Sequence, residues 1–206
     1  MVTIPSLRHW IAAVFFVASL SAISRAEDPP PSARPFVQER AWIFSYEFDV
    51  PYDSFDSQFR AIDVQAFRAA HAWKVRYGLE GQLGALVFLG FGTKSEPLSS
   101  TPPENSDAGG VGFGPDARWN FVQTRRIRLF ADGESDFIYA LPQFPAGGSA
   151  TNAFLRAGGG IAYRFGDKRW LEAGYRRAHV SNGGGIVPSN PAWNGKGIYV
   201  GVRFVR

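Results

Sequence analysis

The residues best suited to chemistry lie close together near the C-terminus, in the segment His179-Val180-Ser181-Asn182. His179 and Ser181 are two residues apart, so on a β-strand both side chains would point to the same face. An imidazole beside a hydroxyl can take the hydroxyl proton, which lets the oxygen attack an ester carbonyl. A His and a Ser can equally share a polar interface without any catalytic role, and the spacing alone leaves both interpretations open.

A catalytic His–Ser pair needs two further elements nearby. Three glycines, 183–185, follow at once, and backbone amides in such a turn could stabilise an oxyanion. A third group must hold the imidazole in the tautomer that accepts the Ser proton. Glu172 precedes the pair on the same run of residues, but it would point to the opposite face and is a poor candidate. Arg177 would share the face of His179, where it could contact a lipid phosphate or simply extend toward water.

Runs of alternating side chains are expected to position these residues, because a period of two is typical of β-strands. Their connections alternate in length: long ones cover 49–58, 94–109, 142–149 and 182–195, whereas the others are short, the first of them at 71–73. This alternation is typical of an outer-membrane barrel, which has short turns at one end and long loops at the other. The eight runs are 38–48, 59–70, 74–93, 110–123, 125–141, 150–165, 169–181 and 196–206.

Charge on one face of these runs indicates where the strands lie. In 127–141, Asp132, Glu134 and Asp136 share one face, and apolar side chains occupy the other. The three carboxylates could form a Ca²⁺ site, but a ladder of ion pairs inside a barrel is the favoured interpretation. The arginines expected in this ladder are Arg128, Arg156, Arg164 and Arg176.

The pattern predicts an all-β fold, an eight-stranded antiparallel transmembrane β-barrel with a lumen filled by side chains. A soluble amphipathic sheet is the alternative, but it would need a second apolar layer to cover it. In lipid, closure is obligatory because unpaired strand edges would leave backbone polar groups unsatisfied. Aromatic side chains are expected to form interfacial girdles at Trp42, Tyr46, Phe48, Trp119 and Tyr139.

The N-terminal region predicts export. Residues 1–26 have a basic start, a short apolar run and a small-residue cleavage site, as in a signal peptide. A Pro-rich lead is expected at 27–36 and the barrel at 37–206. The chain has no cysteine, so no disulfide can stabilise it. The net charge of +4 suits anionic lipid, and no basic–aromatic motif indicates nucleic acid binding.

The segment from 175 to 204 resembles the outer-membrane lipid A 3-O-deacylase family, whose relatives are often called acyloxyacyl hydrolases. The resemblance rests on His179-Val180-Ser181-Asn182, the glycines that follow, and Asn190-Pro191 before the final run. It covers about 30 residues closely. It implies an eight-stranded barrel in a Gram-negative outer membrane that removes an ester-linked acyl chain from lipid A with a Ser-His-Glu triad and no metal.

The resemblance also assigns roles to individual residues. Ser181 matches the nucleophile and His179 the general base, and Asn182 is the Asn that follows them. Asn182, Gly184 and Asn190 form the set expected to support the site and its oxyanion. The family's Glu falls on Asn194 if the loop has one extra residue and on Trp193 if it has not. An Asn can orient an imidazole, as in Cys-His-Asn sites, but it cannot stabilise an imidazolium by charge.

The sequence therefore predicts a serine esterase of the outer leaflet that acts on lipid A or lipopolysaccharide, with the 3-position chain as its expected target. No cofactor and no nucleic acid partner are expected, and a homodimer stays open as an assembly. A non-catalytic small barrel with a structural or adhesive role is the main alternative, and the absence of a triad acid favours it. Phospholipase activity is a third hypothesis.

Overall fold

A computed structural model describes residues 37–52, 60–95, 102–182 and 191–206. The barrel unit begins at Val37. The expected signal peptide and Pro-rich lead, and the predicted site residues Gly184 and Asn190, lie outside the described residues.

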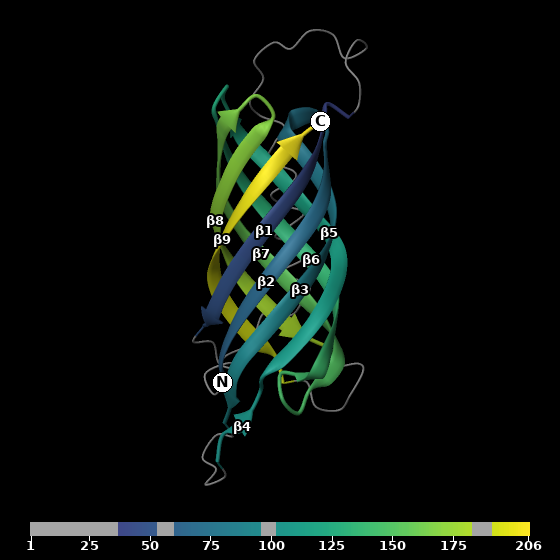
Figure 1. The fold of residues 1–206 in the computed structure, drawn as a ribbon, viewed down its shortest axis with the longest axis vertical. Coiled ribbons are helices and arrows are strands. Elements are labelled where there is room, and N and C mark those ends of the chain that lie inside the picture. Colours follow the sequence, from purple (N-terminus) through teal and green to yellow (C-terminus); the bar gives the residue numbers. More distant parts are fainter. Residues whose placement is uncertain (1–36, 53–59, 96–101, 183–190) are drawn as a thin grey trace, which may run out of the picture. The chain divides into compact units, whose positions relative to one another are not determined.

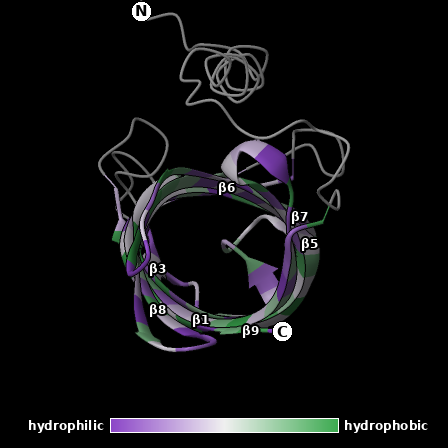
Figure 2. Cartoon of the chain, turned by 90° about the horizontal axis from the view of Figure 1, so that it is seen from above, coloured by the Kyte–Doolittle hydropathy of each residue, from purple (hydrophilic) through white to green (hydrophobic). Residues whose placement is uncertain are grey.

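The described chain forms a closed antiparallel barrel of eight strands, which confirms the predicted fold class (Figure 1). Strands that follow one another around the ring pair antiparallel, and pairing of the first strand with the last closes the wall. Seen along its axis, the wall is a continuous ring (Figure 2). The barrel strands are β1 (Glu39–Pro51), β2 (Arg60–Lys74), β3 (Leu79–Lys94), β5 (Ala108–Gln123), β6 (Ile127–Phe144), β7 (Ser149–Gly166), β8 (Arg169–Ser181) and β9 (Trp193–Val205).

A short additional strand, β4 (Glu104–Asn105), pairs with Thr93 and Lys94 at the end of β3 and extends one long loop beyond the rim. Among the described residues, no helix is long and apolar enough to cross a membrane.

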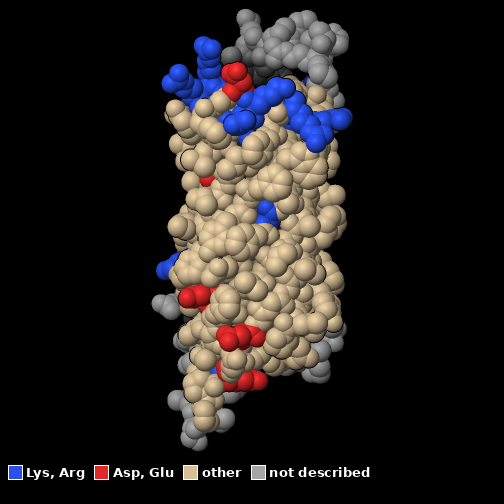
Figure 3. Space-filling view, in the orientation of Figure 1, with Lys and Arg blue, Asp and Glu red and all other residues tan. Residues whose placement is uncertain are grey.

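The outer surface of the wall is apolar along most of its length. Side chains alternate between exposed and buried along each strand, and the exposed ones include Phe44, Phe137 and Ile198. In Figure 3 the middle of the barrel carries few charges, whereas Lys and Arg gather at the end that bears the C-terminus. Apolar side chains on this scale would be unfavourable in water, so this surface is built to face hydrocarbon.

The first short turn differs in position from the prediction. Instead of ending near 70, β2 continues to Lys74, and the turn contains a short 3-10 segment, η3 (Arg76–Gly78). Tyr77 and Gly78 have φ values of 62° and 76°, and a Cβ at position 78 would meet the Asn120 carbonyl oxygen at 2.4 Å. Glycine fits there because it has no Cβ.

This longer β2 changes the interpretation of His71, which the sequence placed in the turn. His71 is a strand residue whose ring lies 5.0 Å from Trp42 and 4.5 Å from Trp73, measured between centroids. It is therefore part of an aromatic cluster on the outer surface near the short-turn end, as expected of an interfacial girdle.

The middle of the lumen is filled by an ion-pair network, as predicted for Asp132, Glu134 and Asp136. Arg156 contacts Glu134 and lies 2.7 Å from Asp136, and Arg176 lies 2.8 Å from Asp132 and 3.0 Å from Glu134. These side chains are almost fully buried, so each charge depends on its partners rather than on water.

Two arginines of the predicted ladder lie elsewhere. Arg128 pairs with Glu39 at 2.6 Å, near the short-turn rim. Arg164 was wrongly assigned to the ladder: it bonds the carbonyl oxygens of Gly166 and Asp167 in the β7–β8 turn. Its position, close to the end of β7, leaves it beyond reach of the central carboxylates.

An apolar cluster fills the lumen toward the long-loop end. Phe88, Phe144 and Phe154 pack together, and Trp193 packs against Phe144. The Trp193 indole N–H donates to the Ile62 carbonyl oxygen at 3.0 Å. This cluster holds the ends of β8 and β9 in place from the inside of the wall.

Candidate active site

Three polar side chains meet on the outer face of β8 and β9. His179 stands opposite Asn194 in the β8–β9 register, and Ser181 is the last residue of β8. The His179 Nε2 atom lies 2.9 Å from Ser181 Oγ, and Nδ1 lies 2.7 Å from Asn194 Oδ1. The imidazole therefore bridges the hydroxyl and the amide. His179, Ser181 and Asn194 are the three residues that the sequence proposed as catalytic.

The chemistry of the amide determines which ring nitrogen carries the proton. Because Asn194 Oδ1 can only accept a hydrogen bond, the facing Nδ1 must donate one. Nε2 is then left with its lone pair and can accept the Ser181 hydroxyl proton. This is the arrangement of a general base beside a nucleophile, with a third group fixing the tautomer.

Strand alternation explains why these side chains share one face. Val180 and Trp193 are buried in the lumen, whereas their neighbours His179, Ser181 and Asn194 are partly exposed on the outside. The same alternation decides between the two positions that the sequence left open for the third group. Trp193 points away from His179, so Asn194 is the residue that meets the imidazole.

No carboxylate takes the place of the expected triad acid on these strands. The sequence has no Asp or Glu after Glu172. Glu172 itself lies in the lumen, where its oxygens are 2.8 Å from Arg118 and 2.6 Å from Arg203. Its exclusion as the third group, made from strand parity, is confirmed.

The predicted oxyanion residues are only partly described. Asn182 directly follows β8 and is buried, in contrast to the partly exposed Ser181. Gly184 and Asn190 lie in 183–190, outside the described residues, so their supporting role stays a prediction. Among the described residues, no cluster of His, Asp and Glu side chains could hold a metal ion.

Three further residues lie beside the site. Tyr52 and Lys196 were missed by sequence reasoning, whereas Arg177 was noticed. The backbone N–H of Tyr52, just after β1, donates to the Asn194 carbonyl oxygen at 2.9 Å. Arg177, considered earlier as a lipid contact, has its guanidinium carbon 4.6 Å from the centre of the Tyr52 ring. Lys196 stands opposite Arg177 in the β8–β9 register. The sequence carried no signal for this pairing, because register depends on the loop that joins the two strands.

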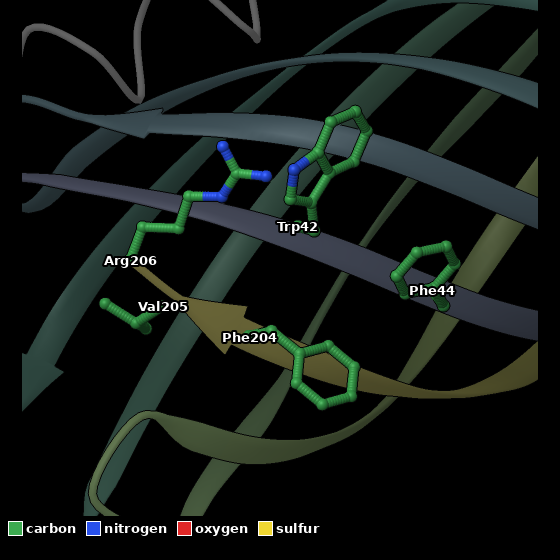
Figure 4. Close-up of a pocket in the computed structure, with 5 residues that line it drawn as sticks. All are labelled: Trp42, Phe44, Phe204, Val205 and Arg206. Carbon is green, nitrogen blue, oxygen red and sulfur yellow. The ribbon is translucent and has the colours of Figure 1, made fainter.

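A surface depression at the other end of the barrel is separate from this site. It has a volume of about 440 Å³ and lies between β1 and β9 (Figure 4). The C-terminal Arg206 extends across it toward Trp42. Because β8 runs from the short-turn end to the long-loop end, His179 and Ser181 are far from this depression. The lining residues are Trp42, Phe44, Phe204, Val205 and Arg206.

The closed wall, the apolar exterior and the packed lumen define the chain as a small outer-membrane β-barrel. No family model matches the sequence, and no curated protein matches it significantly.

Among solved structures, the chain is similar to Neisserial surface protein A (NspA), with 15% identity and a TM-score of 0.54 over 81% of this chain and 96% of NspA. This similarity shows the barrel fold. The outer membrane protein AlkL also matches, at 12% identity and a TM-score of 0.43, over 88% of this chain and 97% of AlkL.

Proposed function

We propose that this barrel is an outer-membrane serine esterase that removes an ester-linked acyl chain, at the 3-position, from lipid A. The observation that carries the proposal is the imidazole of His179, which contacts Ser181 Oγ through one nitrogen and Asn194 Oδ1 through the other. The resemblance of the 175–204 segment to lipid A 3-O-deacylases supplies the substrate class.

In the proposed reaction, Ser181 Oγ attacks the ester carbonyl carbon while His179 Nε2 takes the hydroxyl proton. The bond between the carbonyl carbon and the sugar oxygen then breaks, and His179 returns the proton to that oxygen. Water then attacks the acyl carbon while His179 takes one of its protons; the bond from that carbon to Ser181 Oγ breaks, His179 returns the proton to Ser181 Oγ, and the fatty acid leaves. Asn194 is a positioning residue, since it holds the ring in the tautomer that each step needs.

The position of the pair on the wall suits a substrate that stays in the membrane. His179 and Ser181 face outward near the long-loop end of β8, on the same face as the apolar Leu171 and Tyr175. A lipid could reach them by lateral diffusion, without leaving the bilayer. Because the lumen is packed with side chains, a lipid cannot reach the pair from inside the barrel, and the outer wall is the route that remains.

The direct test is mass spectrometry of lipid A from cells that express the chain. Wild type should yield lipid A lighter by one acyl chain, and Ser181→Ala and His179→Ala should yield unmodified lipid A. Thr93→Ala is the matched control, because it also removes an exposed hydroxyl but on β3, which lies four strands away from β8 around the ring. Heat-modifiable migration on gels shows whether each variant has folded. Unmodified lipid A from folded wild type, or full activity in Ser181→Ala, would refute the proposal.

A non-catalytic barrel is the second candidate, and one observation favours it: the group behind His179 is a neutral amide and not a carboxylate. A structural or adhesive protein could carry the same side chains as remnants of an active relative. The experiment above separates the two functions, since a non-catalytic barrel leaves lipid A unmodified in every variant. Release of lysophospholipid would instead indicate phospholipase activity.

A further inference from the structure

Two cations face each other across β8 and β9, next to the candidate active site. Arg177 and Lys196 are register partners, and the next outward-facing pair along the same strands is His179 and Asn194. Outward positions on one strand are about 7 Å apart. Arg177 and Lys196 are both exposed. The cationic pair and the imidazole therefore lie on one continuous patch of the outer wall.

The two cations both lie close to the ring of Tyr52, beside the candidate active site. The Arg177 guanidinium carbon lies 4.6 Å from the ring centre, and the Lys196 ammonium lies 5.6 Å from it. Tyr52 is held beside Asn194 by its backbone hydrogen bond. Both long side chains thus extend from deeper positions toward the rim, and their charged ends converge there.

Within the described residues, this arrangement places two positive charges opposite each other. Like charges directly opposite each other on neighbouring strands repel. Within the described part of the chain, neither Arg177 nor Lys196 forms an ion pair with a carboxylate, although the lumen arginines are heavily paired. The aromatic ring stabilises cations but supplies no negative charge. An anion between the two would be held by charge-assisted hydrogen bonds from both.

We infer that Arg177 and Lys196, converging on Tyr52, bind the phosphate group of a membrane lipid and so position its ester at Ser181. This inference rests on the proposed function for the reaction, but phosphate binding can be measured without it. A phosphorylated glycolipid headgroup can carry phosphate and ester on the same sugar ring, which suits the short separation between the cations and the His–Ser pair. A phospholipid offers the same phosphate chemistry and is the other source.

The test measures binding and turnover separately, on the full chain in detergent. Native mass spectrometry gives the Kd of the Ser181→Ala protein for phosphorylated lipid A, dephosphorylated lipid A and phosphatidylglycerol. Adding Arg177→Gln and Lys196→Gln should weaken binding of phosphorylated lipid A about tenfold, and leave the dephosphorylated form unaffected. If the Gln pair also weakens binding of phosphatidylglycerol, the site binds the phosphate of any lipid. If binding of phosphatidylglycerol is unchanged, the site is specific for the glycolipid.

The control replaces Arg125 and Lys168 by Gln, because these exposed residues lie in the short turns at the opposite end and give the same change in net charge. Arg177→Lys should retain most of the binding. In the active background, the Gln pair should raise KM about tenfold and leave kcat unchanged. An unchanged Kd for phosphorylated lipid A in the folded Gln pair, or an equal loss for the dephosphorylated lipid, would overturn the inference. If the phosphate-dependent binding is observed but the protein has no turnover, the proposed esterase function is refuted and the phosphate site stands.

Discussion

Replacing Asn194 by Asp should convert the orienting amide into a charged partner for His179. Asp has the shape of Asn, so the oxygen that now lies 2.7 Å from His179 Nδ1 can keep its place. The imidazole gains a positive charge when it takes the Ser181 proton, and an amide cannot balance that charge. A carboxylate at the same position would stabilise the transition state more than the ground state, so kcat should rise.

The size of the increase follows from the strength of the two hydrogen bonds. A hydrogen bond between neutral groups contributes about 0.5–1.5 kcal/mol, and one to a charged group about 1.5–3 kcal/mol. The difference of about 1–1.5 kcal/mol corresponds to an increase of about 5- to 12-fold in kcat. KM should change little, because the gain arises only when the imidazole is charged. Asn194→Leu, which removes the neutral bond, should lower kcat by about 2- to 12-fold.

The assay is release of fatty acid from purified lipid A in detergent, with kcat and KM measured for each variant. Asn105→Asp is the control, since it makes the same chemical change at an exposed residue of β4, on an outer loop. Equal activity of the wild type, Asn194→Asp and Asn194→Leu would show that Asn194 does not orient the imidazole. A change in KM alone would assign Asn194 to substrate contact instead.

Two further predictions concern the wall and the lumen. Arg156→Met removes the cation that contacts Glu134, Asp136 and Glu47, and should lower the free energy of unfolding by about 3–5 kcal/mol. Urea unfolding in lipid vesicles measures this, and a loss below about 1 kcal/mol would contradict the network. Val200→Arg places a charge midway along β9 on the outer face and should cost about 2–4 kcal/mol in the same assay. The same change at Thr93, near the rim, should cost about 0–1 kcal/mol, and equal costs would show that no hydrocarbon surrounds the wall.

Much of the fold could be predicted from the sequence because a barrel wall imposes a strict period of two. The apolar residues of 127–141 were predicted to share the face opposite the charged lumen, and Phe137, Tyr139 and Leu141 are exposed on the outside of β6. The partners inside the lumen could not be predicted. Arg203, for example, pairs with Glu80 at 2.7 Å, and these residues are 123 positions apart. Only the three-dimensional closure of the wall brings them together.

The site was predictable to the extent that it is local. His179 and Ser181 follow from a two-residue spacing on one strand, and Asn194 was suggested by the resemblance rather than by any pattern in the residues. Choosing between Trp193 and Asn194 required the register of β9, which depends on the length of the connection after Asn182. The contribution of Tyr52 required the closure of β1 against β9, which no local pattern contains.

The hydroxyl, the imidazole and the amide all come from the final two strands, and β1 completes their surroundings by pairing with β9. In a barrel that is still assembling, the Tyr52 ring on which Arg177 and Lys196 converge is missing until the terminal seam between β1 and β9 has closed. Binding of a lipid phosphate at this point, as inferred above, would then begin only after insertion is finished. Lipid binding would serve as a reporter of completed biogenesis.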